Sequence, residues 1–240
     1  MILEQSVVEL ATPTGPMRTY VYAPVDKRPR PGVVLYSEIF QRTGPIGRIA
    51  ALLAGQGLVV AVPEIFHELE PAGTVIGYDH ADVGNRHKLT KPALAHDADA
   101  RAVLDHLASR ADCSGALHTM GVCIGGHLAF RCAFDARIRS AACFYATDLH
   151  QASLDGGDDS LARAGDIAGE LLLVWGRSDP HIPDAGRDLI HARLRNAGRR
   201  FTWHEVEAAH AFLRDEGPRY DPALALWSYR MVLDLIARTS

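Results

Sequence analysis

The sequence predicts an α/β protein with a mostly parallel central sheet, helices on both faces and no separate cap domain. Short, almost wholly apolar runs at 33–36, 58–62 and 171–175 have the composition of strands that are covered on both faces. Segments with helical periodicity separate such runs, and strand–helix–strand units of this spacing predict parallel pairing. Because no repeat, linker or low-complexity tract divides the chain, residues 1–240 are expected to form one domain.

The first third of the chain contains four expected strands and one helix. A turn rich in proline and glycine separates strands at 6–11 and 17–24. A loop of prolines and basic residues then leads to the buried strand at 33–36. A helix at about 46–55 and the apolar strand at 58–62 complete a βαβ unit.

The middle of the chain begins with its least regular part, residues 64–92, which mix charges with prolines and glycines. A loop of this length in a compact domain is usually functional or mobile. Residues 93–109 then have apolar side chains at helical spacing, and the short run at 116–120 predicts another buried strand.

The remaining elements alternate between strand and helix. Asp184 is expected to cap one of these helices, and Gly198 follows its end. Strands are expected within 138–145 and at 171–175 and 201–206, helices through Cys132 and at 184–197 and 222–237, and a polar connection at 148–168.

Composition and charge are those of a soluble enzyme. A formal net charge of −4 gives no electrostatic reason to expect a nucleic acid partner. The 12 histidines are scattered without metal-ligand spacing, so neither a metal nor another cofactor is expected. The N-terminus resembles no signal peptide, and no apolar run reaches transmembrane length. The four cysteines are best explained as reduced thiols, which predicts a cytoplasmic protein with no membrane association.

One decapeptide, 121–130, has the pattern of a catalytic turn. It follows the expected strand at 116–120 and opens a helix, with Gly121 two residues before Cys123 and Gly125 two residues after it. This is the nucleophile elbow of an α/β-hydrolase with cysteine in place of serine. A free cysteine is more often a small buried hydrophobe, but core packing alone does not require glycine on both sides at this spacing. Cys123 is therefore predicted to be the nucleophile.

The rest of a triad follows in the order nucleophile, acid, histidine. Asp179 and His210 each come just after an expected strand, where reactive groups gather in a doubly wound sheet. His210 would accept the thiol proton, and Asp179 would fix its tautomer. Asp184 is a rival for the acid, and His181 and His204 are rivals for the base.

An oxyanion hole needs two converging backbone N–H donors. The amide after the nucleophile is that of Ile124, and the loop after the strand at 33–36 supplies Ile39 as the second donor. Backbone donors leave little trace in side-chain identity, so this prediction rests on position alone.

Four motifs together resemble the dienelactone hydrolase (carboxymethylenebutenolidase) family over about residues 15–237. They are the decapeptide 121–130, the Ser-Glu-Ile-Phe segment 37–40, Gly-Arg-Ser-Asp-Pro at 176–180 and His-Ala-Phe-Leu-Arg at 210–214, and they occur in family order. The resemblance implies that Cys123, Asp179 and His210 form the triad.

The same resemblance assigns further site residues. Glu38 matches a glutamate that contacts the resting thiol and helps to generate the thiolate when substrate binds. A carboxylate beside the sulfur disfavours the thiolate, so the charge near Cys123 would decide how reactive it is. Arg214 matches one of two arginines that bind a substrate carboxylate. The second arginine is expected in the irregular region 64–92, where Arg86 is the one arginine present. Lys88 or Lys91 could take its role instead. Two aromatic residues, Tyr78 and Tyr145, are candidates for lining the pocket.

The sequence thus predicts a cysteine-dependent hydrolase of small lactones or esters, with a carboxylate-bearing small molecule as substrate and a monomer or small homo-oligomer as assembly. A non-catalytic ligand-binding protein on the same fold is an alternative, because fold does not dictate function. A thioesterase-type hydrolase that uses the same triad is another.

Overall fold

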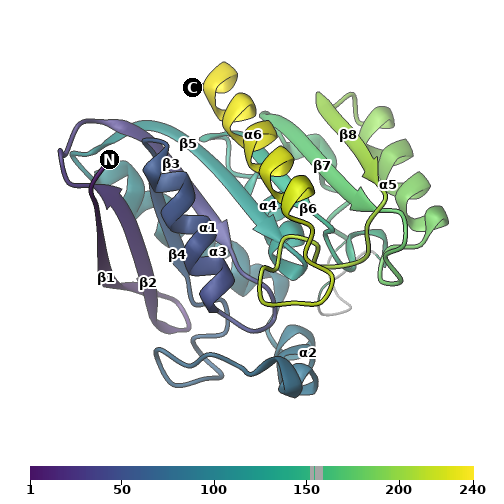
Figure 1. The fold of residues 1–240 in the computed structure, drawn as a ribbon, viewed down its shortest axis with the longest axis horizontal. Coiled ribbons are helices and arrows are strands. Elements are labelled where there is room, and N and C mark those ends of the chain that lie inside the picture. The colour runs from purple at the N-terminus through teal and green to yellow at the C-terminus, as the bar shows by residue number, and fades with distance from the viewer. Residues whose placement is uncertain (152–153, 155–158) are drawn as a thin grey trace.

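One eight-stranded sheet organises the computed structural model, which describes residues 1–151, 154 and 159–240 (Figure 1). The strands are β1 (Leu3–Thr12), β2 (Gly15–Pro24), β3 (Arg30–Tyr36), β4 (Val59–Pro63), β5 (Cys113–Val122), β6 (Ile138–Phe144), β7 (Glu170–Gly176) and β8 (Phe201–Val206). The α-helices are α1 (Gly44–Gly55), α2 (Ala81–Thr90), α3 (Ala93–Ser109), α4 (Ile124–Cys132), α5 (Asp184–Asn196) and α6 (Pro222–Thr239).

The strand order β1-β2-β4-β3-β5-β6-β7-β8 confirms the predicted fold class. The β1–β2 and β2–β4 pairs are antiparallel, and every pair from β4 to β8 is parallel. Because β5, β6, β7 and β8 are parallel to one another, the carboxyl ends of these four strands lie at the same end of the sheet. Polar side chains that follow these strands are therefore brought together.

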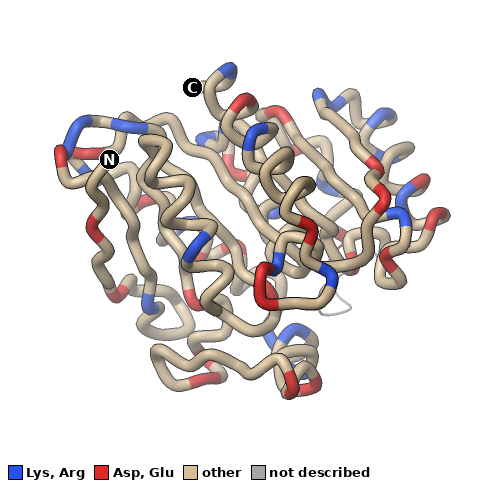
Figure 2. The backbone as a smooth tube through the Cα atoms, viewed as in Figure 1, with Lys and Arg blue, Asp and Glu red and all other residues tan. Residues whose placement is uncertain are grey.

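Helices cover both faces of this sheet. In Figure 1, α1 and α6 lie in front of it, and α3 and α4 lie behind it. The strands between these two layers are almost wholly buried, as in β4, where all five residues are buried. Lys and Arg are interspersed with Asp and Glu over the whole fold, as Figure 2 shows.

The segment 64–92, expected to be irregular, contains helix. A 3₁₀ turn at Tyr78–His80 leads directly into α2, which lies beyond the carboxyl ends of the strands (Figure 1). Only Gly84 of α2 is buried, so this helix has no apolar stripe that periodicity could detect. Part of the predicted polar connection at 148–168 lies outside the described residues.

Two smaller expectations concern α5. Its N-cap is Pro183, and Asp184 is instead the first helical residue, where a carboxylate still favours the positive end of the helix dipole. Gly198 follows the helix with a positive φ of 65°, which is the backbone conformation that glycine tolerates best.

The four cysteines are free, as predicted. Among the helices that the structure describes, none combines the length and the apolar composition that a membrane crossing requires.

A buried histidine on α4 ties this helix to the loop after β6. His127 Nδ1 lies 3.0 Å from the carbonyl oxygen of Thr147, and its Nε2 lies 2.7 Å from Ser160 Oγ. The carbonyl can only accept, so Nδ1 carries the proton and Nε2 accepts from the hydroxyl. Burial lowers the pKa of His127 to about 4, although its bond to Thr147 acts in the opposite direction.

Acid should therefore destabilise the fold through His127. A folded-state pKa of about 4, against 6.5 for the unfolded chain, means that this stabilisation is complete above pH 6.5 and is lost as the pH falls towards 4. The loss at pH 4 should be about 3 kcal/mol in the free energy of unfolding.

Urea unfolding of the wild type and of His127→Gln at pH 7 and pH 4 measures this effect. The variant should lose less stability between the two pH values than the wild type. Equal losses in the two proteins would show that His127 does not bear this pH dependence.

Candidate active site

Cys123 occupies the sharp turn between β5 and α4 in a backbone conformation that most residues avoid. Its φ is 60° and its ψ is −128°, which costs a residue other than glycine about 1–3 kcal/mol. Its backbone groups are held on two sides. The N–H donates to the carbonyl of Phe144 at 3.1 Å, and the carbonyl accepts from Gly126 and Thr147. The side chain is 8% exposed.

Gly121 and Gly125 permit the close approach that this turn requires. A Cβ built on Gly121 would lie 1.9 Å from the carbonyl oxygen of Gly125. One built on Gly125 would lie 2.5 Å from the backbone oxygens of Tyr36 and Ser37. These neighbours are backbone atoms that cannot turn away, so the glycines fix α4 against the ends of β3 and β5.

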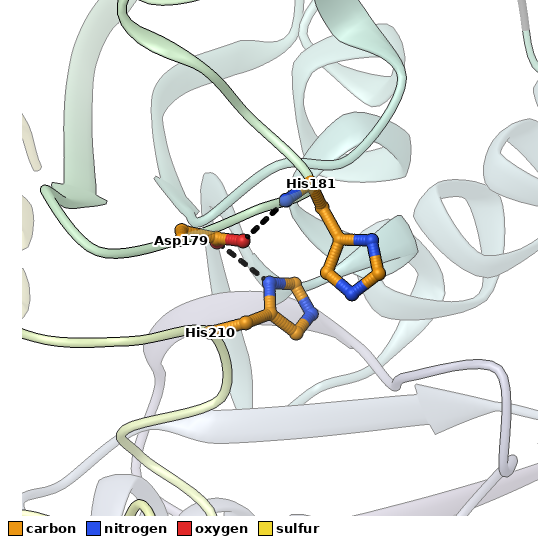
Figure 3. Close-up of side chains that lie close together, drawn as sticks. All are labelled: Asp179, His181 and His210. Carbon is orange, nitrogen blue, oxygen red and sulfur yellow. Dashed lines mark hydrogen bonds and ion pairs between the residues drawn. The ribbon is translucent and has the colours of Figure 1, made fainter.

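Asp179 and His210 meet at the same edge of the sheet. His210 Nδ1 lies 2.7 Å from Asp179 Oδ2, and both side chains are nearly inaccessible to solvent (Figure 3). The other carboxylate oxygen of Asp179 accepts the backbone N–H of His181 at 2.9 Å. Both oxygens of Asp179 are thus engaged, and the Nε2 of His210 is left for another partner.

The Cys123 sulfur and Asp179 both affect the pKa of His210. Burial by itself lowers the pKa of His210, but the charge of a Cys123 thiolate and the hydrogen bond that His210 donates to Asp179 outweigh it. The net effect raises the pKa to about 10. A thiolate and an imidazolium therefore stabilise each other in this site.

For the other three thiols, burial has the largest effect on the pKa. Burial raises the pKa of Cys132 to about 12 and raises the pKa of Cys143 still further. Burial also raises the pKa of Cys113, at the start of β5. Since the thiolate is the nucleophilic form, these cysteines are poor candidates for chemistry.

The backbone amides of Ile39 and Ile124 are the two donors predicted for an oxyanion hole. Ile124 is the first residue of α4, and Ile39 lies in the loop after β3. Within the described ranges, neither N–H donates to a protein acceptor. Ile39 also lines the cavity that contains Cys123.

Glu38 and Arg214 form a two-pronged ion pair beside this cavity. Arg214 Nη2 lies 2.9 Å from Glu38 Oε1, and Arg214 Nε lies 3.0 Å from Glu38 Oε2. Glu38 is 1% exposed. The guanidinium also lies over the rings of Phe40 and Tyr78, at 5.1 and 4.5 Å from their centroids. The pair thus joins the loop after β3 to the segment after His210.

A cavity of about 250 Å³ opens over these groups. This is below the 300–1,000 Å³ that is usual for ligand pockets, so the space suits a small molecule. Its walls come from the loop after β3, from α2 and from the segments that carry Cys123, Asp179 and His210. The lining residues are Ile39, Phe40, Tyr78, Ala81, Asn85, Lys88, Cys123, Thr147, Asp148, His181, His210, Arg214 and Arg219.

The remaining predicted binding residues fall in different places. Tyr78 lines the cavity, whereas Tyr145 is buried behind it, with its ring 5.0 Å from the His210 ring in an edge-on contact. Arg86 does not line the cavity. Its side chain is 67% exposed and lies 3.3 Å from Asp82 on the outside of α2.

The two lysines named as alternatives to Arg86 also lie in different places. Lys88 lines the cavity, with its Nζ 2.7 Å from Asp148 Oδ2. Lys91 is buried away from the cavity lining, between the carboxylates of Glu68 and Asp99.

The rival triad residues have other partners. Asp184 forms an ion pair with Arg187 on α5. His204 lies in β8 against the ring of Trp227. His181, however, lines the cavity beside His210.

Sequence reasoning missed helix α2, Asn85 and Arg219, and it gave Lys88 only as an alternative to Arg86. Asn85 projects from a helix that has no apolar period, and Arg219 lies in the loop before α6, outside every motif. The charge pattern of residues 81–90 is the one sequence signal that indicates helix α2. Asp82 lies in the first turn of α2, and His87 and Lys88 lie in its last turn, as the helix dipole favours.

The fold gathers metal-ligand side chains that sequence spacing does not reveal. In the described part of the chain, two such groups have ligand atoms within 4.8 Å of one another. One comprises Asp179, His181 and His210, and the other comprises His67, Glu68 and Asp99.

Comparison with known proteins relates this architecture to one family. The sequence model of the dienelactone hydrolase family matches residues 17–240. A Saccharomyces cerevisiae protein named "Putative carboxymethylenebutenolidase" is 38% identical over 239 residues, which cover 93% of this chain and 88% of that protein. A carboxymethylenebutenolidase of Pseudomonas putida is 25% identical over 217 residues, which cover 88% of this chain and 87% of that protein.

A solved structure shows the same fold. It is titled "Putative Dienelactone Hydrolase" and comes from Klebsiella pneumoniae. It superposes with a TM-score of 0.89 over 99% of both chains, at 21% identity. With the family match across nearly the whole sequence, this chain belongs to the dienelactone hydrolase family of hydrolases with the α/β-hydrolase fold.

Proposed function

We propose that this enzyme hydrolyses small lactones or carboxylic esters that carry a carboxylate, through an acyl-enzyme on Cys123. The observation that carries the proposal is that His210 is buried, is hydrogen-bonded to Asp179 and lines the same small cavity as Cys123, whose thiolate charge raises the pKa of His210. The names of its relatives support lactone hydrolysis as the reaction.

In the acylation step, the Cys123 thiolate attacks the acyl carbon. The amides of Ile39 and Ile124 would stabilise the negative charge on the carbonyl oxygen of the tetrahedral intermediate. The imidazolium of His210 gives its proton to the departing alkoxide oxygen. In a lactone that oxygen stays on the same molecule, so the ring opens and the product remains attached as a thioester.

In the deacylation step, His210 acts as a base. Once the sulfur is acylated, the thiolate charge that raised the pKa of His210 is gone, so burial again favours the neutral imidazole. Asp179 holds the Nδ1 proton, which leaves Nε2 free to accept a proton from water. Attack by that water on the thioester breaks the bond to sulfur, which releases the acid and restores the Cys123 thiolate beside the His210 imidazolium. One histidine thereby serves as acid and then as base.

The substrate carboxylate would be bound by cations on the cavity wall. Arg214 and Lys88 face the cavity while paired with Glu38 and Asp148, so an anion would have to share or displace those partners. Arg219 is exposed at the rim of the same cavity. The family resemblance suggests that Glu38, once displaced from Arg214, helps to generate the Cys123 thiolate.

Removal of the sulfur should abolish turnover. We expect Cys123→Ala to lower kcat on an activated lactone by about 10³-fold or more, as removal of a triad member does elsewhere. Cys113→Ala, which removes a thiol outside the cavity, is the matched control and should retain wild-type kcat. Full activity in Cys123→Ala would contradict the mechanism, and tight binding without turnover in the wild type would favour a non-catalytic receptor.

Binding of the carboxylate should depend on Arg219 and not on Arg86. With an ester that bears a carboxylate, Arg219→Gln should raise KM about tenfold, because a charge-assisted hydrogen bond is lost. Its KM for the uncharged methyl analogue should stay near the wild-type value. Arg86→Gln alters a charge outside the cavity, so it should change neither constant. A larger effect from Arg86→Gln would reverse the assignment.

A further inference from the structure

The one buried residue of α2 is a glycine, and it faces the backbone of Ile39. A Cβ built on Gly84 would lie 2.5 Å from the carbonyl oxygen of Ile39, 2.9 Å from its Cβ and 3.1 Å from its carbonyl carbon. Helix α2 therefore packs against the turn after β3 at this glycine. The residue that it meets there carries one of the two amides predicted for the oxyanion hole.

Backbone conformation does not explain why residue 84 is a glycine. Gly84 lies within α2 and is not among the glycines with a positive φ. Alanine would adopt the same helical backbone and is the better helix former. The remaining reason is space. Real Cβ atoms essentially never approach other atoms to 2.5 Å, and the main chain of Ile39 cannot swing aside as the end of a flexible side chain would.

The turn that contains Ile39 is held on both sides. The N–H of Gln41 donates to the carbonyl of Glu38 at 3.1 Å and so closes the turn. The N–H of Ile76 donates to the carbonyl of Phe40 at 3.2 Å. A side chain on the facing residue of α2 would push Ile39 within this anchored turn, so its backbone would have to rotate.

The ion pair between Lys88 and Asp148 opposes a movement of α2 away from Ile39. Lys88 Nζ lies 2.7 Å from Asp148 Oδ2 in the loop after β6. Gly84 and Lys88 are four positions apart and so lie on the same face of the helix. A movement of α2 at Gly84 would therefore also move Lys88 in the cavity wall, whereas a rotation of the Ile39 backbone would leave Lys88 in place.

We propose that Gly84 is a positioning residue that keeps the Ile39 amide directed into the oxyanion hole. This inference rests on the proposed function, in which that amide stabilises the tetrahedral intermediate. An oxyanion donor has to lie about 2.7–3.1 Å from the oxygen on which charge develops, and a misplacement of about 1 Å can cost about 100-fold in rate. Gly84 does not line the cavity, so it acts through Ile39.

The first test is hydrolysis of an uncharged ester by Gly84→Ala. The variant should lower kcat about 10–100-fold with a KM near the wild-type value, because the oxyanion forms only as the acyl carbon is attacked. Gly55→Ala is the matched control, since a Cβ built on this last residue of α1 meets nothing within 4 Å, and it should keep the wild-type kcat. An unchanged kcat in Gly84→Ala, with a raised KM only for an ester that bears a carboxylate, would show that α2 moves instead and would overturn the proposal.

A double-mutant cycle tests whether Gly84 acts through the Ile39 amide. Ile39→Pro removes the N–H donor at the second position of a turn, which favours proline, and should lower kcat about 10²–10³-fold. Addition of Gly84→Ala to this variant should then cause little further loss. Losses that multiply would show that the two residues act independently and would contradict the proposal.

A third measurement does not depend on turnover. The Cys123 thiolate adds to the carbonyl carbon of a trifluoromethyl ketone, so a carbon–sulfur bond forms and the π electrons move to oxygen. That oxyanion needs the same two donors as the intermediate. Iodoacetamide instead alkylates the sulfur with loss of iodide and forms no oxyanion. Gly84→Ala should therefore weaken the affinity for the ketone, measured as protection of Cys123 against alkylation, about 10–100-fold. Its alkylation rate without the ketone should equal that of the wild type.

These results separate failure of the proposed function from failure of the role of Gly84. If the wild type hydrolyses no ester, the proposed function fails, and the ketone measurement still decides whether Gly84 positions the Ile39 amide. An unchanged alkylation rate also shows that Gly84→Ala keeps the pair of Cys123 and His210 intact. Equal ketone affinity in the wild type and Gly84→Ala, or a loss of alkylation rate as large as the loss of ketone affinity, would overturn the proposal.

Discussion

The backbone of Cys123 is the constraint on which the rest of the site depends. A φ of 60° is maintained because β6 accepts the Cys123 N–H, while α4 and the loop after β6 donate to its carbonyl. In the described chain, five of the six non-glycine residues with positive φ lie in loops that surround the site, namely Gln41, Cys123, Tyr145, Asp148 and Ala211. Such strain persists only where surrounding contacts fix the backbone. The sheet and its flanking helices supply those contacts, and they hold Cys123 at the cavity that His210 also lines.

The fold, and the meeting of Asp179 with His210, could be predicted from sequence because each depends on local patterns. The apolar runs that become β3, β4 and β7 are buried strands, and residues 93–109 form α3 as predicted. Asp179 and His210 were identified because parallel strands bring the residues that follow them to one edge. The structure places these two side chains 2.7 Å apart, although they are separated by 31 positions in the chain.

The walls of the cavity could not be predicted, because they depend on tertiary packing. Helix α2 buries only one residue, so neither its existence nor the inward direction of Lys88 is encoded in an apolar period. Arg86 is predicted to bind the substrate carboxylate because it is the one arginine in that region. Residues two positions apart on a helix, such as Arg86 and Lys88, point to opposite sides. Lys88 faces the cavity while Arg86 faces outwards. The ion pair between Glu38 and Arg214 joins residues 176 positions apart and follows from no local signal.

The most direct measurement of the central claim is the mass of the enzyme during turnover of a slow ester. After an acid quench, the mass should increase by that of the acyl group. Fragmentation of the peptide should place that group on Cys123 rather than Cys113, and hydroxylamine should remove it as expected of a thioester. Continued turnover with no adduct on Cys123, or with the acyl group on another residue, would contradict the account.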